Sequence, residues 1–333
     1  MKTPAFVVTA SPHLKGPAST PVIMWSVVGS LLPIVVASTY FFGISAILVV
    51  AAATLGAVLT EAGFGSRQTL VDGSGAITGL LLGLTLPAGL PLWMAFVGGA
   101  FGIGFGKLIF GGLGYNVFNP ALLARAFLQA AFPGPMTTWA ARSGSWWTLA
   151  GDNFALPLMR GDPTAMTTEA TPLGLLKFEK VGTALGPLFF GTTGGSIGET
   201  SALLILLCGG YLAWKRYLNW RTPVSIFATV ALVSWGMYAV DHKYPGPLFM
   251  LLSGGLMLGA VYMATDMVTS PTTNRGRWIF GAGVGVLVVT IRIWGGLPES
   301  VMYSILLMNA LVPFINRATE PRVFGTRLRK ADA

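Results

Sequence analysis

The sequence is poor in cysteine and histidine, with one Cys and two His among 333 residues. The cysteine, Cys208, lies in an apolar run. One thiol forms no intramolecular disulfide and supplies only one of the roughly four thiolates that an iron–sulfur cluster requires. His13 lies near the N-terminus and His242 in a predicted loop, so they cannot face each other as paired axial haem ligands. Any iron–sulfur cluster must therefore belong to a partner, and a b-type cytochrome is not expected.

Charged residues are also scarce. They make up 10% of the chain, against about 25% in ordinary soluble domains, while 53% of the residues are hydrophobic and the mean hydropathy is +0.69. This composition predicts a polytopic membrane protein. The net charge of +9 is assigned to Lys and Arg that set topology, because the chain has no nucleic-acid-binding motif. The first 20 residues lack the compact apolar region and cleavage site of a signal peptide, so we expect a short N-terminal tail.

Apolar runs predict an all-α polytopic membrane protein with ten transmembrane segments, some of them short or broken. A spanning helix needs about 20 apolar residues, although shorter or interrupted helices are tolerated inside a bundle. The segments expected in the first half are 21–42, 44–63, 75–87, 90–109 and 119–132. Those expected in the second half are 201–214, 223–240, 246–265, 278–294 and 300–315.

These segments divide the chain into five expected regions. They are an N-terminal tail (1–20), a first five-helix repeat (21–133), a long loop (134–200), a second five-helix repeat (201–316) and a basic tail (317–333). Because cytoplasmic loops carry an excess of Lys and Arg, the charge distribution places both tails in the cytoplasm. It assigns Lys107 to that side, and Arg292 and the long loop to the outer, periplasmic side of a bacterial inner membrane.

The two halves carry related patterns. The pattern Gly-Gly-Leu, Val and Leu-Leu within 111–123 recurs within 295–307 at a constant offset. Since five segments per half is an odd number, the second half must be inverted relative to the first, as in many transporters. Chance similarity between helices rich in Gly and Leu is the alternative. In an inverted repeat, the short third segment and its counterpart, which contains Gly254 and Gly255, are expected to be broken near a central site.

Thr171 ends a hydroxyl-rich stretch, 167–171, in the longest hydrophilic interval of the chain. We expect a water-exposed loop there, whose hydroxyl is not needed for helix packing. Such a hydroxyl can be esterified by a phosphate when a separate enzyme presents an activated nucleotide. The residues alone favour an ordinary loop, with Thr168 capping a turn over 173–178.

Other polar residues interrupt or flank the predicted segments. Arg125 lies inside the fifth segment, where a charge is costly unless paired or hydrated, so it has either a functional role or a structural one. Asn119 is expected to cap that segment and to leave backbone amides for an anionic partner. Asp266 is a candidate for ion coupling, with a solvated helix end as the simpler interpretation. Glu199 and Thr200 precede the sixth segment, with Thr200 as its expected cap.

Several polar motifs carry a family resemblance. They are SPH at 11–13, DGSGAITG at 72–79, GYNVFNPA at 114–121, GSIGETS at 195–201, ATD at 264–266 with TSP at 269–271, and LMNAL at 307–311. In this order they resemble, over nearly the whole chain, the family that contains the D subunit of Rnf ion-translocating ferredoxin:NAD+ oxidoreductases and the B subunit of Na+-translocating NADH:quinone reductases. The short N-terminal tail is more similar to the Rnf protein, because its quinone reductase counterpart has a longer extension.

The resemblance implies a membrane electron-transfer subunit of a complex that exports Na+ or H+. In that family FMN is attached through its phosphate to the last residue of a motif Asp-x-x-Ser/Thr-Gly-Ala-Thr. Thr168, Ala170 and Thr171 match this motif, whereas Glu169 replaces its Gly and Ala165 replaces its acid. The implied cofactors are FMN on Thr171 and a second, non-covalent flavin such as riboflavin.

The implied partners are the other Rnf subunits, which would supply the ferredoxin or NAD sites and the iron–sulfur clusters, together with membrane lipid and a flavin transferase. Glu199, Thr200, Asn119 and Arg125 are further candidates for flavin contact. The tryptophans of the long loop could cover a flavin ring, but we interpret them as interface anchors; they are Trp139, Trp146 and Trp147. The alternative of a different class is a transporter or channel for a small solute, which an inverted repeat also suits.

Overall fold

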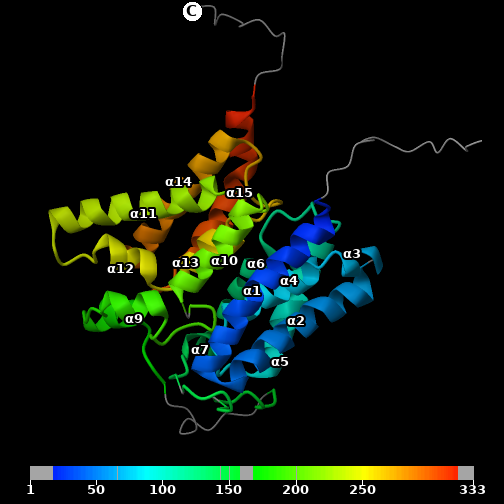
Figure 1. Cartoon of the computed structure of the whole chain (residues 1–333), viewed down its shortest axis with the longest axis horizontal. Helices are drawn as coiled ribbons and strands as arrows, with labels where there is room; N and C mark the ends of the chain where they lie inside the picture. Colours follow the sequence, from blue (N-terminus) through cyan, green and yellow to red (C-terminus); the bar gives the residue numbers. More distant parts are fainter. Residues whose placement is uncertain are drawn as a thin grey trace, which may run out of the picture.

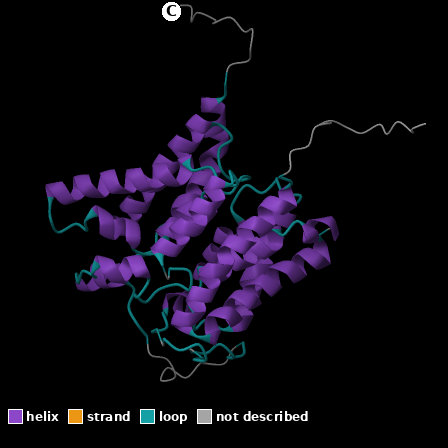
Figure 2. Ribbon diagram, in the orientation of Figure 1, coloured by secondary structure: helices purple, strands orange, loops and turns teal. Residues whose placement is uncertain are grey.

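The computed structural model describes residues 18–65, 67–142, 144–149, 151–157, 168–199 and 201–321. Figure 2 shows that these parts of the chain are built from helices and connecting loops. Their one isolated β-bridge joins Ala140 to Thr168. The expected all-α class is confirmed.

The first half contains seven named helices and one π-helical turn. They are α1 (Thr20–Phe42), α2 (Ile44–Phe64), α3 (Arg67–Val71), α4 (Ser74–Leu84), α5 (Leu92–Ile103) continued by η1 (Gly104–Leu108), α6 (Pro120–Ala131) and α7 (Pro133–Thr137). The remaining elements are α8 (Pro172–Gly174) continued by η2 (Leu175–Glu179), α9 (Leu185–Phe190), α10 (Ala202–Trp214), α11 (Arg221–Val240), α12 (Pro247–Leu252), α13 (Leu256–Leu258) continued by η3 (Gly259–Met263), α14 (Asn274–Trp294) and α15 (Val301–Thr319).

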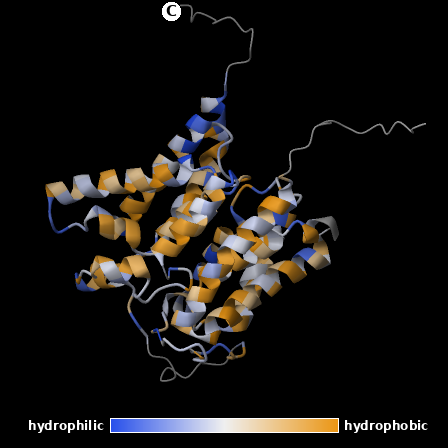
Figure 3. Ribbon diagram, viewed as in Figure 1, coloured by the Kyte–Doolittle hydropathy of each residue, from blue (hydrophilic) through white to orange (hydrophobic). Residues whose placement is uncertain are grey.

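The chain is a multi-pass membrane protein. Among the described residues, five helices are long and apolar enough to cross a membrane: α1, α2, α11, α14 and α15. Three shorter apolar stretches accompany them: α4, α5 with η1, and α10. Figure 3 shows hydrophobic residues along most helices, and hydrophilic residues at the end of α15 and in several loops. Each of the ten segments expected from the sequence overlaps one of the named helices; the fifth overlaps α6, and the eighth overlaps the broken helix formed by α12 and α13.

Two of the expected segments are interrupted. Helix α4 ends at Leu84, before the limit expected from the sequence, and an irregular stretch leads to α5. The eighth segment breaks between α12 and α13, where Gly254 has a φ of 66° that favours glycine. Inside a membrane, backbone groups released by such breaks must find partners within the protein.

At the first break, the partners come from distant parts of the chain. The backbone N–H of Ile197 donates to the carbonyl of Leu86 over 3.1 Å, and that of Gly198 donates to the carbonyl of Leu84. The Asn153 side chain donates to two more carbonyls, those of Ala88 and Leu90, over 2.9 and 3.0 Å. The segment 191–199 therefore re-enters the core and supports the end of α4; we call it the re-entrant segment.

At the second break, a buried side chain supplies the donors. The guanidinium of Arg292, on α14, donates to the carbonyls of Met250 and Ser253, the latter over 2.8 Å. Arg292 is only 6% exposed. Arg292, which the sequence counted among the charges on the outer side, therefore caps the broken helix and is not a loop charge.

Glycines bring two helix pairs into close contact. In the first half, Gly56 of α2 lies against the backbone of Phe96, and Gly99 of α5 lies against that of Ala53. In the second half, Gly281 and Gly285 of α14 lie against α11. Small residues at these positions let the helix backbones approach, as is common in membranes. Across the two halves, α1 packs on α10 and α6 packs on α15.

The ends of the described chain and the loops between the halves lie at opposite edges. In Figure 1, α1 begins and α15 ends toward the upper edge. Helix α7 and the loops that surround it lie toward the lower edge. The break regions lie between these edges.

A prediction concerns the contact of α2 with α5. A Cβ atom at Gly99 would lie 2.1 Å from the carbonyl oxygen of Ala53 and 2.9 Å from the backbone nitrogen of Ala57. We expect Gly99→Ala to lower the free energy of unfolding by about 1–3 kcal/mol, because the helices must move apart. Thermal denaturation of the detergent-purified chain measures this. Gly29→Ala, at a position with open space within 4 Å, is the matched control and should melt like the wild type.

Candidate functional site

Thr171 is buried and caps a helical segment. Only 6% of it is exposed, and its Oγ1 accepts a hydrogen bond from the backbone N–H of Gly174 over 3.1 Å. The expectation of a water-exposed hydroxyl at this position is therefore wrong. Thr168, which the sequence favoured as the cap, is exposed and lies in the bridge to Ala140. The local sequence explains the cap, because Pro172 occupies the first helical position.

The helical segment that follows Thr171, formed by α8 and η2, is fixed to the second half of the protein. Leu173 is buried against Leu188 and Phe249. The Lys177 ammonium group donates to three backbone carbonyls at the end of α14 and in the loop that follows it, those of Arg292, Gly295 and Leu297. Partial burial lowers the pKa of Lys177. These contacts hold the position of Thr171 against the loop that joins α14 to α15.

Thr171 lines a cavity of about 390 Å³, which we call the Thr171 cavity. Apolar and aromatic side chains dominate its wall, together with a few charged groups. The lining residues include Met136, Trp139, Ala170, Phe178, Leu297, Met302, Tyr303, Arg125, Glu179 and Glu299. Trp139 is half-buried in this wall, whereas Trp146 and Trp147 are exposed.

Arg125 forms an ion pair with Glu299 in the wall of the Thr171 cavity. Arg125 comes from α6 and Glu299 from the loop before α15, so the pair joins the two halves. Arg125 is 5% exposed, and the Glu299 side chain is 25% exposed. One carboxylate oxygen of Glu299, Oε1, has no hydrogen-bond partner among the described residues. Glu299 was missed from the sequence, because it lies 174 residues from Arg125.

A smaller cavity of about 20 Å³ lies behind this ion pair. Arg125 and Glu299 line it as well, together with Thr85, Gly255 and Arg292 from the two helix breaks. The pair therefore lies between the Thr171 cavity and the smaller cavity at the helix breaks.

Glu199 lies close to these breaks, and it precedes α10 as expected from the sequence. Its carboxylate oxygens lie 2.6 Å and 3.4 Å from the positions that a Cβ would take on Gly195 and Gly255. The cap of α10 is Ser201, whose Oγ accepts from the N–H of Leu204 over 3.3 Å. Thr200, the cap expected from the sequence, lies outside the described residues, as does Ala165.

Asn119 caps α6 as expected. Its Oδ1 accepts from the N–H groups of Ala121 and Leu122 over 3.0 and 3.3 Å. Its Nδ2 donates across the two halves to the carbonyl of Met263, over 3.2 Å. The side chain thus occupies two of the helix-end amides that were expected to face an anionic partner.

A third cavity, of about 100 Å³, lies between the halves, and we call it the Asn116 cavity. Asn116, Asn119, Lys107, Tyr262 and Asp266 provide its polar groups. Oδ1 of Asn116 is buried and has no partner among the described residues. The Asp266 carboxylate accepts from Val268 N and Thr269 Oγ1, so it stabilises its own turn and is not a freely solvated helix end.

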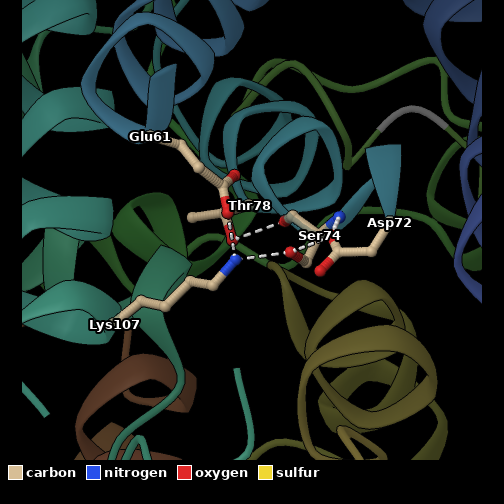
Figure 4. Close-up of polar contacts among 5 residues, drawn as sticks. All are labelled: Glu61, Asp72, Ser74, Thr78 and Lys107. Carbon is tan, nitrogen blue, oxygen red and sulfur yellow. Dashed lines mark hydrogen bonds and ion pairs between the residues drawn. The ribbon is translucent and has the colours of Figure 1, made fainter. Parts of the chain in front are cut away.

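A buried polar network borders the Asn116 cavity (Figure 4). The ammonium group of Lys107 forms an ion pair with Glu61 and also donates to the hydroxyl of Ser74. The Ser74 hydroxyl donates to Asp72, and the Thr78 hydroxyl donates to the carbonyl of Ser74. Glu61 and Lys107 are 1% and 2% exposed, so Lys107, which the sequence counted among the charges on the cytoplasmic side, is a buried partner of Glu61.

The sequence did hold a signal for this network. Glu61 lies in the predicted segment 44–63 and Lys107 in the predicted segment 90–109. Opposite charges in two apolar segments are costly in a membrane unless they pair. The described residues contain no group of three or more His, Cys, Asp or Glu arranged to hold a metal ion.

Comparison with known proteins settles the family. The model of the NQR2, RnfD, RnfE family matches residues 7–325. The chain belongs to this family. The resemblance seen in the sequence is confirmed.

Curated relatives match this member of the NQR2, RnfD, RnfE family over almost its entire length. It is 41% identical to the D subunit of the proton-translocating ferredoxin:NAD(+) oxidoreductase complex of Clostridium ljungdahlii, with 98% of each chain covered. It is 40% identical to the D subunit of the Na(+)-translocating complex of Acetobacterium woodii, covering 97% of this chain and 96% of the relative. The D subunit of the ion-translocating oxidoreductase complex of Stutzerimonas stutzeri is 42% identical, with 92% of each chain covered.

Four of the motifs that carried the family resemblance lie at the cavities and breaks. The motif at 72–79 contains Ser74 of the buried network, and the motifs at 114–121 and 264–266 line the Asn116 cavity. The motif at 195–201 contains the re-entrant residues that support α4. In this family member, polar sequence features within apolar segments therefore mark the sites where backbone groups or charges need partners.

A prediction concerns the ion pair of Glu61 and Lys107. We expect Lys107→Met to lower the free energy of unfolding by about 3–5 kcal/mol, because it leaves the Glu61 carboxylate buried without a counter-charge. The double variant Glu61→Gln with Lys107→Met should regain part of this loss. Thermal unfolding of the purified variants measures both effects, and a single variant as stable as the wild type would contradict the prediction.

Proposed function

We propose that the chain is the D subunit of an Rnf-type ion-translocating ferredoxin:NAD+ oxidoreductase complex, through which electrons pass by way of flavins. The observation that carries this is the identity of about 40% to curated D subunits over nearly the full length of both chains. The matched sequence includes the residues that line the cavities and those at the helix breaks. A redox subunit therefore explains these features better than a transporter or channel for a small solute.

We infer that FMN is attached to Thr171 as a phosphoester. The hydroxyl lines a cavity with a largely apolar, aromatic wall, as a flavin ring requires. Thr171 also precedes the eight helical residues of α8 and η2, and the start of a helix favours a phosphate. The residues present therefore fit the group. When bound, FMN supplies the electron-transfer chemistry.

The side chains of this chain would position the flavin and set its surroundings. Thr171 provides the attachment oxygen, and Ala170 adjoins it in the cavity wall. Trp139, Phe178 and Tyr303 provide aromatic surface that excludes water from the ring. Thr168, outside the cavity, matches the attachment motif and is exposed to a flavin transferase.

A second, non-covalent flavin such as riboflavin is assigned to the Asn116 cavity. Its support is the buried, unpartnered Oδ1 of Asn116, which can accept a hydrogen bond from an N–H group of a flavin ring. Asn119 and Asp266 lie in the same wall. Asp266 is also our candidate for coupling electron transfer to Na+ or H+ movement, because it is a carboxylate at a cavity between the halves.

We propose that the two halves are inverted repeats of five segments. Three pairs of matching contacts support this: α2 on α5 with α11 on α14, α5 on α6 with α14 on α15, and α2 on α4 with α11 on α12. The breaks after α4 and α12 occupy the third position of each half. Broken helices at matching places are the usual sign of such a repeat.

The proposed orientation places both termini in the cytoplasm and Thr171 on the outer side of the membrane. The ends of the described chain lie at the edge opposite α7 and its neighbouring loops (Figure 1), as this orientation requires. With Lys107 and Arg292 removed from the surface count, most of the remaining Lys and Arg residues still fall on the cytoplasmic side. Partner subunits would provide the iron–sulfur clusters, because the chain has one cysteine.

A first prediction tests the flavin attachment. The chain produced together with a flavin transferase should give a fluorescent band under ultraviolet light after denaturing electrophoresis. Thr171→Ala should abolish this fluorescence completely. Thr137→Ala is the matched control, because Thr137 also offers a hydroxyl to the Thr171 cavity, and its band should remain fluorescent.

A wild-type band without fluorescence would refute the covalent flavin. Fluorescence that survives Thr171→Ala would refute the residue and leave the family unaffected. Flavin released by denaturing the Thr171→Ala variant measures the second, non-covalent flavin, and its absence would refute that site.

A second prediction tests the orientation. In a Cys208→Ser background, cysteine is introduced at Thr168 and at Glu320, both of which are exposed. A membrane-impermeant thiol reagent added outside intact cells should label Thr168→Cys and not Glu320→Cys, whereas inside-out vesicles should reverse the result. Labelling of Thr168→Cys only in inside-out vesicles would show that the proposed orientation is wrong.

A further inference from the structure

The Thr171 cavity has opposite charges in one wall. Arg125 and Glu299 both line it, each from a different half of the protein. Their ion pair leaves Glu299 Oε1 without a hydrogen-bond partner among the described residues. Because Arg125 is 5% exposed, water does little to screen its charge. A group bound in this cavity therefore experiences the charges of both residues.

Other charges around the cavity are held in place by different contacts. Lys177 is bound to three backbone carbonyls, and Arg292 caps α12. Glu199 lies at the re-entrant segment, close to Gly195 and Gly255. Glu179 lines the same cavity from η2, where it is exposed. The buried Arg125 and the partly exposed Glu299 are thus the charged groups in the cavity wall that pair with each other.

We propose that Arg125 and Glu299 set the midpoint potential of the flavin attached to Thr171, with opposite effects. This inference rests on the proposed flavin. Arg125 stabilises the reduced flavin and raises its potential, whereas Glu299 weakens that effect and lowers the potential. The position of the pair between the two halves makes the potential depend on how closely α6 and the start of α15 approach.

The physical reason is the charge added on reduction. An electron brings one negative charge to the cavity, and the electron comes from the redox partners of the complex. A guanidinium group beside the ring stabilises that charge, and a carboxylate group destabilises it. The phosphate carries the same charge before and after reduction, so it shifts the potential by a constant amount. At an effective dielectric constant of about 20, a unit charge in the cavity wall changes the ratio of reduced to oxidised flavin by about tenfold or more at a fixed potential.

The test is a spectroelectrochemical titration of the full chain, produced with a flavin transferase and purified in detergent. Glu299→Gln should raise the midpoint potential, and Arg125→Gln should lower it. The double variant should lie near the wild type, because both charges are gone. Thr171→Val identifies which part of the titration belongs to the attached flavin.

A further variant, Arg125→Lys, and the Glu299→Gln variant separate an effect of charge on the potential from an effect of lost stability. Arg125→Lys keeps the charge and should keep the potential close to that of the wild type, even where thermal stability falls. Glu299→Gln keeps the shape of a partly exposed side chain, so the test stands even if Arg125→Gln fails to fold. Equal potentials in the wild type and Glu299→Gln, with a fluorescent band present, would overturn the inference and leave the attached flavin intact. The absence of any fluorescent band would overturn both.

Discussion

The structure depends on one constraint: backbone groups released by a broken helix inside a membrane must still form hydrogen bonds. Helix α4 meets it with the backbone of the re-entrant segment and with Asn153. The break after α12 meets it with the guanidinium of Arg292. The two halves thus solve the same problem with different chemistry, and both solutions bring polar groups to the centre of an apolar protein.

The low-dielectric interior also requires partners for buried charges, which are backbone carbonyls for Arg292 and an opposite charge for two ion pairs. Glu61 and Lys107 pair within the first half, and Arg125 and Glu299 pair between the halves. Lys107 lines the Asn116 cavity, whereas Arg125 and Glu299 line both the Thr171 cavity and the smaller cavity next to it. An isolated charge at these depths would be strongly destabilising. Charges that are paired are tolerated there, and they place charged groups in the walls of the cavities.

The sequence predicted the helices well because the signal for them is local. Apolar runs gave segments that overlap the observed helices, and Asn119 was recognised as a cap from its own neighbours. It failed where the environment of a side chain is set by distant residues. Thr171 is covered by a cavity wall drawn from several helices, and Glu299 contacts Arg125 although the two lie 174 residues apart in the chain. The burial of Lys107 and Arg292 was missed because a count of charges near segment ends cannot distinguish a solvated charge from one buried in an ion pair or at a helix cap.

The link between the halves also decides how this protein can move. The re-entrant segment is bonded to α4, and Ser38 of α1 donates to the carbonyl of Ile197 over 2.8 Å. Before this segment in the chain, Lys177 donates to the carbonyls of Gly295 and Leu297 in the loop that joins α14 to α15. Transporters with inverted repeats commonly rock one half against the other. Here the loop between the halves is bonded to the first half through the re-entrant segment and to the second half through Lys177, so each half carries one end of this loop with it. Rocking one half against the other would therefore have to be taken up by the stretch between Lys177 and the re-entrant segment, which contains α9.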